Sequence, residues 1–242
     1  MKLTLIDISS IGTIIEKSKM KPVAVFYGDF NILNSFFEKT ISFNKEVRTV
    51  IYPDSSLVFL MVKLFKGIFS KRIVSTDLIY DTLNYANNNR LKMYFFGDNL
   101  ETLEAVKRKL EKDYQQIIVT GFQNGYDYET NKVVNEINIS KPDIVLIGLG
   151  AIRQEKWLFE NAERINCGTL ITAGGFFRYF GNGKFRAPKI FRIFYLEWLF
   201  KLALEFKRVA ERYFYIAPKF VLRFIKMRNE IDIGKFDENS LF

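Results

Sequence analysis

The stretch from Pro142 to Trp157 constrains the fold of this chain most. An uninterrupted apolar run, Ile144 to Ile147, ends in Gly148-Leu149-Gly150, and a charged helix start follows at once. Such a run is typical of a strand buried on both faces of a parallel sheet, and open α/β sheets bind ligands in the turn after such a strand. The turn lacks the third glycine of a dinucleotide-binding fingerprint. We therefore interpret it as a ligand site of another kind, with polar groups from Arg153, Gln154 and Lys156.

The rest of the chain alternates between strand-like and helix-like segments. Short β-branched or aromatic runs predict strands at Val23–Tyr27, Arg48–Tyr52, Leu91–Phe96, Gln116–Thr120, Ile144–Gly148 and Thr169–Thr172. Helical patterns lie between them at about 31–40, 56–65, 77–87, 100–112, 129–140 and 154–164. This alternation predicts an α/β fold with a doubly wound, mostly parallel, Rossmann-like sheet. We expect two domains, an α/β ligand-binding domain over 1–190 and a helical, basic appendage over 191–242.

Positive charge is concentrated in one part of the chain. The net charge is +9, and residues 176–228 hold 13 Lys and Arg against 3 Asp and Glu, whereas residues 1–175 hold 22 against 20. The basic segment is also dense in Phe, Tyr and Trp. This combination indicates an anionic partner with an apolar component.

Two helices are expected within this basic segment. Leu196 to Phe214 has an apolar face at helical spacing, and Pro218 starts a second, shorter helix. In the second helix Lys219, Arg223 and Lys226 recur beside apolar residues, as in a helix that lies in a membrane interface. The alternative is an ordinary bundle helix with a solvated basic face.

Composition excludes several kinds of chemistry. The chain has no histidine, which removes the commonest general base and most catalytic zinc sites. The single cysteine, Cys167, excludes an internal disulfide and is expected to be a buried, inert thiol. The sequence shows no secretory signal and no apolar run of about 18 residues, the length that spans a bilayer. We expect a cytosolic protein or one on the cytosolic face of a membrane.

Other polar groups follow predicted strands. Asp54 ends the second strand, where its carboxylate either projects into the ligand crevice or caps the next helix. Arg72 precedes a helix that begins near Asp77, and is either part of an anion site or of a solvated turn. Glycines recur at the ends of several predicted strands. This recurrence indicates that the backbone approaches a ligand closely there, and the candidates are Gly97, Gly148, Gly150, Gly174 and Gly175.

Together these blocks resemble the WecG/TagA/CpsF family of bacterial glycosyltransferases. The resemblance rests on Gly148-Leu149-Gly150-Ala151-Ile152-Arg153-Gln154-Glu155-Lys156-Trp157, followed by Arg186-Ala187-Pro188 and Leu196-Glu197-Trp198. Pro53-Asp54, Thr76-Asp77-Leu78 and Asn124-Gly125-Tyr126 match further family blocks. The resemblance covers about Val23 to Tyr213.

The resemblance implies an inverting, metal-independent glycosyltransferase that needs no cofactor. It would move a hexosyl or N-acetylhexosaminyl group from a UDP-sugar to a polyprenyl-diphosphate-linked sugar, in capsule, exopolysaccharide or teichoic acid synthesis. Asp54 takes the place of the family's catalytic base, and Arg72 and Gln154 take those of its pocket arginine and glutamine. The basic groups assigned to the lipid acceptor or to an anionic membrane surface are Lys201, Arg208, Arg212, Lys219, Arg223 and Lys226. The enzyme would lie on the inner face of the cell membrane.

Several positions depart from the family pattern. Its Thr-x-Asn aligns with Tyr27-Gly28-Asp29, its Ser-Pro with Ala151-Ile152, and an acidic pocket residue with Arg178. We expect Tyr27, Asp29 and Arg178 to bind substrate, but these departures mean that the sequence does not identify the donor sugar. The alternative is a divergent, non-catalytic member that binds lipid or nucleic acid. With the catalytic interpretation we expect no nucleic-acid partner, and self-association is possible.

Overall fold

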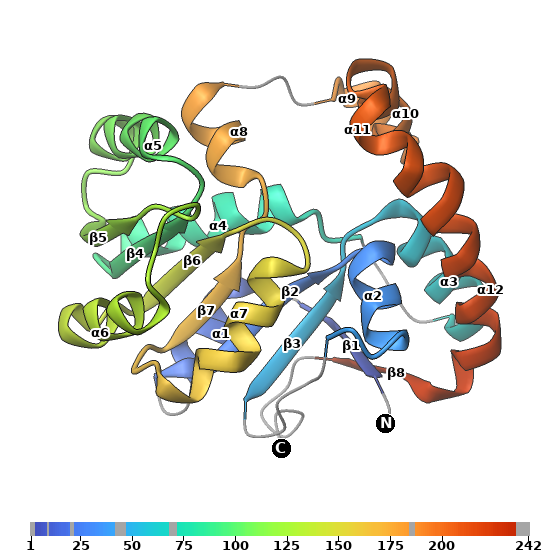
Figure 1. Ribbon diagram of the computed structural model, residues 1–242, viewed down its shortest axis with the longest axis horizontal. Coiled ribbons are helices and arrows are strands. Elements are labelled where there is room, and N and C mark those ends of the chain that lie inside the picture. Colours follow the sequence, from blue (N-terminus) through green and yellow to red (C-terminus); the bar gives the residue numbers. More distant parts are fainter. Residues whose placement is uncertain are drawn as a thin grey trace.

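A computed structural model describes residues 3–8, 10–19, 22–41, 47–67, 72–183 and 187–235. Its centre is a six-stranded sheet in the order β3-β2-β7-β6-β4-β5, and every pair of neighbours is parallel. The strands are β2 (Val23–Gly28), β3 (Arg48–Pro53), β4 (Lys92–Gly97), β5 (Ile118–Gln123), β6 (Ile144–Gly148) and β7 (Thr169–Thr172). The predicted α/β class and all six predicted strands are confirmed (Figure 1).

Helices cover both faces of this sheet, as the continuous apolar strands require. Phe96 and Phe95 of β4 point to opposite faces: Phe96 packs on Trp157 with ring centroids 4.9 Å apart, and Phe95 packs on Phe177 at 6.2 Å. The face of Phe96 carries α2 (Phe30–Phe37) and α7 (Arg153–Asn161), and the other carries α4 (Ser75–Asn88), α5 (Leu100–Asp113) and α8 (Phe176–Asn182). The remaining helices before residue 187 are α1 (Ile11–Ser18), α3 (Ser56–Lys66), α6 (Thr130–Ser140) and the 3-10 turn η1 (Ala162–Arg164).

The two ends of the described chain pair with each other. Strand β1 (Leu3–Asp7) runs parallel to β8 (Ile231–Lys235), with Leu5 opposite Ile233. The sequence pattern did not reveal β1, α1 or β8, because each is short and each strand gains its hydrogen bonds only from the far end of the chain. This small second sheet attaches the end of the C-terminal segment to the start of the protein.

The C-terminal segment is helical, but its first predicted helix is interrupted. Its elements are α9 (Lys189–Ile193), α10 (Glu197–Leu204), α11 (Phe206–Glu211), the π-helical turn η2 (Arg212–Ile216), α12 (Ala217–Met227) and η3 (Arg228–Glu230). The break lies at Glu205, whose φ of −133° is not helical. The second helix begins beside Pro218, as predicted.

The last long helix packs against the α/β unit. Phe220 of α12 lies 6.2 Å from Phe37 of α2, and Phe224 lies 6.1 Å from Phe65 of α3, between ring centroids. Both α12 rings are fully buried. The division into two domains near residue 190 stays a prediction, since these contacts join the two parts. In the part of the chain that the structure describes, no helix is both long enough and apolar enough to cross a membrane.

Candidate active site at the carboxyl ends of the strands

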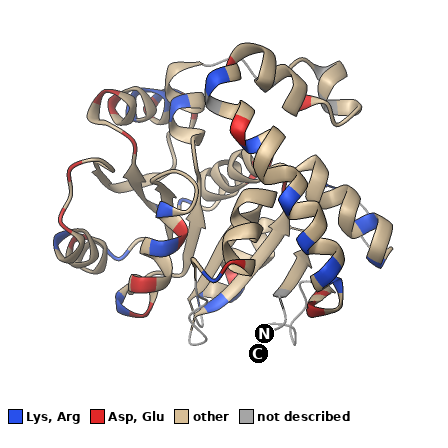
Figure 2. Ribbon diagram, turned by 45° about the vertical axis from the view of Figure 1, so that its right-hand side comes forward, with Lys and Arg blue, Asp and Glu red and all other residues tan. Residues whose placement is uncertain are grey.

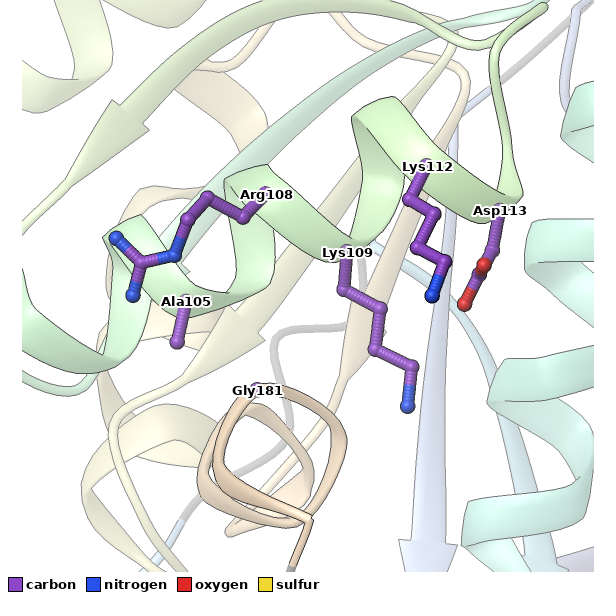
Figure 3. Close-up of a pocket in the computed structure, with 6 residues that line it drawn as sticks. All are labelled: Ala105, Arg108, Lys109, Lys112, Asp113 and Gly181. Atoms are coloured by element: carbon purple, nitrogen blue, oxygen red, sulfur yellow. The ribbon is translucent and has the colours of Figure 1, made fainter.

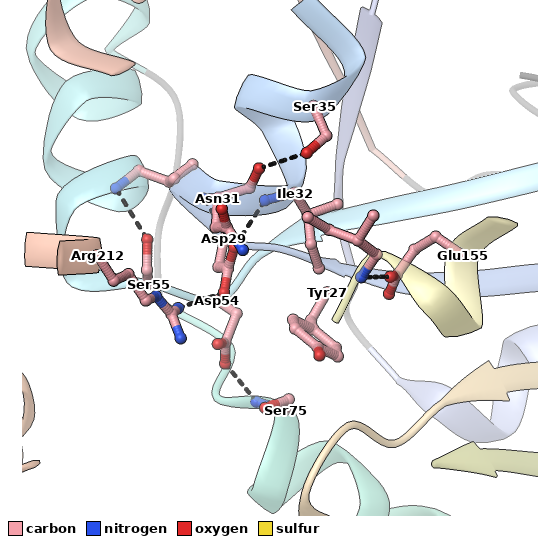
Figure 4. Close-up of polar contacts among 12 residues, drawn as sticks. Tyr27, Asp29, Asn31, Ile32, Ser35, Asp54, Ser55, Ser75, Glu155 and Arg212 are labelled. Atoms are coloured by element: carbon pink, nitrogen blue, oxygen red, sulfur yellow. Dashed lines mark hydrogen bonds and ion pairs between the residues drawn. The ribbon is translucent and has the colours of Figure 1, made fainter. Parts of the chain in front are cut away.

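The ends of β2 and β3 bring two carboxylates to one edge of the sheet. Gly28 lies opposite Pro53 in the parallel register, so Asp29 and Asp54 follow at the same level. The carboxyl ends of parallel strands are where open α/β sheets bind ligands. Asp29 is buried and Asp54 is half-buried (Figure 4).

Asp29 has two structural partners. One carboxylate oxygen, Oδ1, accepts hydrogen bonds from the backbone N–H groups of Asn31 (2.8 Å) and Ile32 (2.9 Å), which caps α2. The other, Oδ2, pairs with the guanidinium of Arg212 in η2. Burial by itself would lower the pKa of Arg212, but Asp29, together with Tyr213, Tyr27 and Asp54, outweighs it and raises that pKa. The Arg212 assigned to the lipid acceptor therefore lies at the strand ends, held by Asp29.

Asp54 meets the start of a helix that is distant in sequence. Its Oδ1 accepts a hydrogen bond of 2.6 Å from the backbone N–H of Ser75, the first residue of α4. The positive end of a helix dipole stabilises a carboxylate in this position. The helix directly after Asp54 is capped by Ser55, whose Oγ accepts from Val58 N–H at 3.2 Å. Asp54 therefore contacts the start of a helix, but that helix is α4 and not α3, the helix that directly follows Asp54. Asp77, which was predicted to bind substrate, lies in the first turn of α4.

Gln154 is fully buried and hydrogen-bonded on every side of its amide. Its Nε2 donates to the Tyr27 hydroxyl (3.0 Å) and to Glu155 Oε1 (2.7 Å). Its Oε1 accepts from the Gly174 backbone N–H at 2.9 Å. Both amide protons are therefore used within the protein, so the structure places Gln154 behind the strand ends, not among groups exposed to a ligand.

Glu155 is a buried carboxyl that the sequence interpretation did not single out. Its Oε2 accepts from the Ile152 backbone N–H at 2.5 Å, at the start of α7. Burial raises the pKa of Glu155 to about 7, although the hydrogen bonds from Gln154 and the backbone oppose the shift. Ile152 itself has a φ of 73°, which strains a β-branched residue. The predicted Arg153 and Lys156 at this turn are exposed.

Arg72 is engaged by the C-terminal segment. Its guanidinium forms an ion pair with Glu197 of α10, donates to Ser56 Oγ and lies 5.1 Å from the ring centroid of Tyr195. Its side chain is only 7% exposed. The structure therefore brings Arg72 to Ser56, the first residue of α3, which is two residues after Asp54. The Glu197 carboxylate already pairs with the Arg72 guanidinium there.

A second group of predicted residues gathers at the ends of β4 and β6. Arg178 of α8 pairs through Nε with Asp98 Oδ2 (2.7 Å) and donates to the Tyr126 hydroxyl. Burial lowers the pKa of Arg178, but Asp98 outweighs that effect and raises it. Arg153 donates to the carbonyl oxygen of Gly125 at 3.1 Å, which joins this group to the start of α7.

The predicted glycines fall into two kinds. A Cβ on Gly97 would overlap the backbone of Gly148, and a Cβ on Gly174 would lie 2.7 Å from the Tyr27 hydroxyl. These glycines permit protein segments to approach one another. Gly150 and Gly175 have nothing within 4 Å of such an atom, so of these glycines they are the ones that leave room for a ligand.

The basic residues assigned to the lipid or membrane are in different surroundings. The side chains of Lys201 and Arg208 lie outside the described residues. Arg223 pairs with Glu38 and donates to Asn34 of α2, so it holds α12 in place. Lys219 lies 3.6 Å from the centroid of the Tyr215 ring, and Lys226 is exposed.

The C-terminal segment nevertheless exposes a large apolar surface. Figure 2 shows Lys and Arg recurring along the helices that lead to α12. The apolar residues exposed among them are Ile190, Ile193, Phe194, Trp198, Leu199, Leu204, Phe206, Phe214, Tyr215, Leu222 and Ile225. Contiguous apolar patches are rare on soluble monomers and often mark an interaction site, so the exposed residues of this segment are candidates for one.

Two hollows on the surface lie away from the predicted site residues. One, between α5 and α8, is lined by Ala105, Arg108, Lys109, Lys112, Asp113 and Gly181 (Figure 3), and a second lies beside α6. Neither of these two hollows contains a predicted site residue. Among the residues that the structure describes, no three acidic or cysteine side chains gather as a metal site would require.

Comparison with known proteins gives a consistent match. The model of the "Glycosyl transferase WecG/TagA/CpsF family" matches residues 12–232. Proteins from Staphylococcus aureus strains NCTC 8325, COL and MSSA476 are each 28% identical over 185 residues, which is 76% of this chain and 72% of theirs. All three are named N-acetylglucosaminyldiphosphoundecaprenol N-acetyl-beta-D-mannosaminyltransferase.

Proposed function

The chain belongs to the WecG/TagA/CpsF family of glycosyltransferases, and from that premise we propose that it transfers a sugar from a UDP-sugar to a polyprenyl-diphosphate-linked sugar. The named activity of the Staphylococcus aureus relatives supports an N-acetylglucosaminyl-diphospholipid as the acceptor class and an N-acetylhexosamine as the transferred group. Bacterial surface polysaccharide synthesis is the process in which such a product is used.

The observation that carries the proposal is the position of Asp54. Its carboxylate stands at the sheet edge with one oxygen held by the start of α4. Asp54 would accept the proton of the acceptor hydroxyl while that oxygen attacks the anomeric carbon. The bond from that carbon to the UDP oxygen breaks as the new bond forms, so the configuration inverts. General-base catalysis of this type contributes about 10²–10⁴-fold.

Cations around Asp54 would stabilise the departing diphosphate. Arg212 lies close enough to Asp54 to interact with its charge and pairs now with Asp29. Arg72 donates to Ser56, two residues after Asp54, and pairs now with Glu197. Arg153 and Arg178 lie toward β4 and β6, with Lys156 on the same helix as Arg153. Preorganised cations and N–H groups supply the largest catalytic term in many enzymes. In this proposal the diphosphate exchanges with a carboxylate partner when it binds, and no metal is involved.

The exposed apolar and basic surface of α9–α12 would bring the enzyme to its lipid acceptor. Apolar side chains insert at the boundary of a membrane, and Lys or Arg near an anionic surface contributes roughly 1 kcal/mol each. Because the same segment supplies Arg212 to the strand ends, docking on the cytoplasmic face would place the lipid diphosphate beside Asp54.

The proposal is tested by incubating the full chain with a synthetic N-acetylglucosaminyl-diphosphoryl-prenyl acceptor. UDP-N-acetylmannosamine, UDP-N-acetylglucosamine and UDP-glucose are supplied separately, and products are identified by mass spectrometry in the presence of a chelator. We expect a disaccharide-lipid with one of these donors. Membrane binding without transfer from any UDP-sugar would favour the non-catalytic alternative.

A further inference from the structure

The buried hydrogen bonds of Gln154 determine how the Tyr27 hydroxyl can be used. Gln154 Nε2 is a donor only, so across the 3.0 Å contact the Tyr27 oxygen must be the acceptor. The hydroxyl proton of Tyr27 therefore does not point at this nitrogen. The proton is therefore available to a different acceptor.

Glu155 keeps this arrangement from reversing. A flipped Gln154 amide would turn its oxygen toward Glu155 Oε1 and Tyr27, and its nitrogen toward the N–H of Gly174. The amide nitrogen would then face the Gly174 N–H, donor against donor, and the amide oxygen would face the Glu155 carboxylate, acceptor against acceptor. Gln154 is completely buried, so water cannot compensate for either mismatch. The amide orientation, and with it the accepting role of the Tyr27 oxygen, is set by three protein partners.

The surroundings of Tyr27 indicate where its proton goes. Figure 4 shows the ring between Asp54 and Glu155, and the hydroxyl lies over Gly174, where a Cβ would be too close. Burial, and then the negative charges of Glu155, Asp29 and Asp54, raise the pKa of Tyr27 well above its ordinary value. The hydroxyl thus stays protonated at every pH at which the enzyme is assayed.

We propose that Tyr27 is a specificity-determining hydrogen-bond donor to an oxygen of the transferred sugar, and that Gln154 and Glu155 are positioning residues that act through it. This inference rests on the proposed function, because the sugar must lie beside Asp54 for its anomeric carbon to be attacked. Gln154 then acts without touching the ligand.

Tyr27→Phe removes the donor and keeps the ring, although one buried amide proton of Gln154 then loses its acceptor. Circular dichroism therefore first checks that the variant is folded. Titration calorimetry compares the wild type and this variant with UDP and with UDP-N-acetylmannosamine. We expect the affinity for the UDP-sugar to fall about tenfold, the loss of one hydrogen bond, while the affinity for UDP stays within about twofold. Tyr114→Phe, at the end of α5, is the control and should change neither affinity.

Gln154→Glu tests the positioning role. At pH 6, below the raised pKa of Glu155 of about 7, the new carboxyl at position 154 and Glu155 can share a proton, and the carboxyl gives the Tyr27 hydroxyl an inward acceptor. Where circular dichroism shows that it is folded, this variant should show the same selective loss, and the Tyr27→Phe/Gln154→Glu double variant should be no worse than Tyr27→Phe. Equal losses for UDP and UDP-sugar, or no loss with Tyr27→Phe, would overturn the inference. A wild type that binds no UDP-sugar would instead refute the proposed function itself.

Discussion

Arg212 of the C-terminal segment forms an ion pair with Asp29 at the end of β2, across 183 residues of chain. The side chain of Asp29 is 3% exposed and that of Arg212 is 33% exposed. A buried carboxylate that loses its partner keeps its desolvation cost. The pair therefore couples the position of the C-terminal helices to the edge of the sheet that carries Asp54.

The strength of that coupling is measurable by a double-mutant cycle. Asp29→Asn keeps an oxygen to cap α2 but loses the charge, and Arg212→Gln loses the other charge. We expect a coupling free energy of about 1–3 kcal/mol from urea unfolding of the two single variants and the double variant. The exposed Glu104–Arg108 pair on α5 is the control, with an expected coupling of about 0.3–0.5 kcal/mol. Equal coupling in the two cycles would show that the Asp29–Arg212 pair stabilises the protein no more than an exposed ion pair does.

Asp54→Asn should separate binding from catalysis. The amide still accepts the Ser75 N–H through its oxygen, but it cannot take a proton at neutral pH. We expect the transfer rate to fall about 10²–10⁴-fold, with the affinity for UDP unchanged. Asp113→Asn, at the exposed end of α5, is the control. A rate equal to that of the wild type would remove Asp54 from the mechanism.

Glu155 should make stability depend on pH. Its pKa rises from 4.5 to about 7 on folding, so the folded state favours the protonated form. The stabilisation that this provides is complete below about pH 4.5 and is lost as the pH rises through 7. The unfolding free energy of the wild type, relative to Glu155→Gln, should fall by about 2–3 kcal/mol between pH 5 and pH 8. Urea denaturation followed by circular dichroism measures it, and the exposed Glu160→Gln is the control.

Two glycines, at the carboxyl ends of β4 and β7, should respond differently to substitution by alanine. Gly97→Ala places a Cβ against the backbone of Gly148 at a φ of 144°, and neither chain segment has room to move. Overlap and backbone strain should together cost about 3 kcal/mol or more. Gly175→Ala meets open space at a φ of −87° and should change stability by less than about 0.5 kcal/mol. Thermal unfolding compares the two, and similar losses would contradict the close approach of Gly97 to the backbone of Gly148.

Membrane binding should depend on the outer face of α12. Leu222 and Ile225 are 64% and 39% exposed, so Leu222→Ser/Ile225→Ser should leave the fold intact. Loss of two apolar anchors should weaken sedimentation with phosphatidylglycerol vesicles at least about tenfold. Ile139→Ser, 74% exposed on α6, is the control and should bind as the wild type does. Unchanged binding by the α12 variant would argue against this surface as the membrane contact.

The sequence by itself determined the sheet and the turn that follows β6. All six central strands have local signals, since continuous apolar runs such as Ile144–Ile147 are buried on both faces whatever surrounds them. The end of a strand is also a local feature, so the position of Asp54 at the carboxyl edge of the sheet followed from its place after β3.

Tertiary structure alone decided which groups meet there. Glu155 and Gln154 are neighbours in sequence, but their connection to Tyr27 and Gly174 crosses 127 and 20 residues. Glu197 and Asp98 became partners of Arg72 and Arg178 in the same way, and β1 has no hydrogen-bonded neighbour until β8 arrives. The physical reason is that side-chain pairing and edge-strand pairing depend on where distant segments pack. Strand burial and helix periodicity depend instead on the pattern of apolar residues within one short segment.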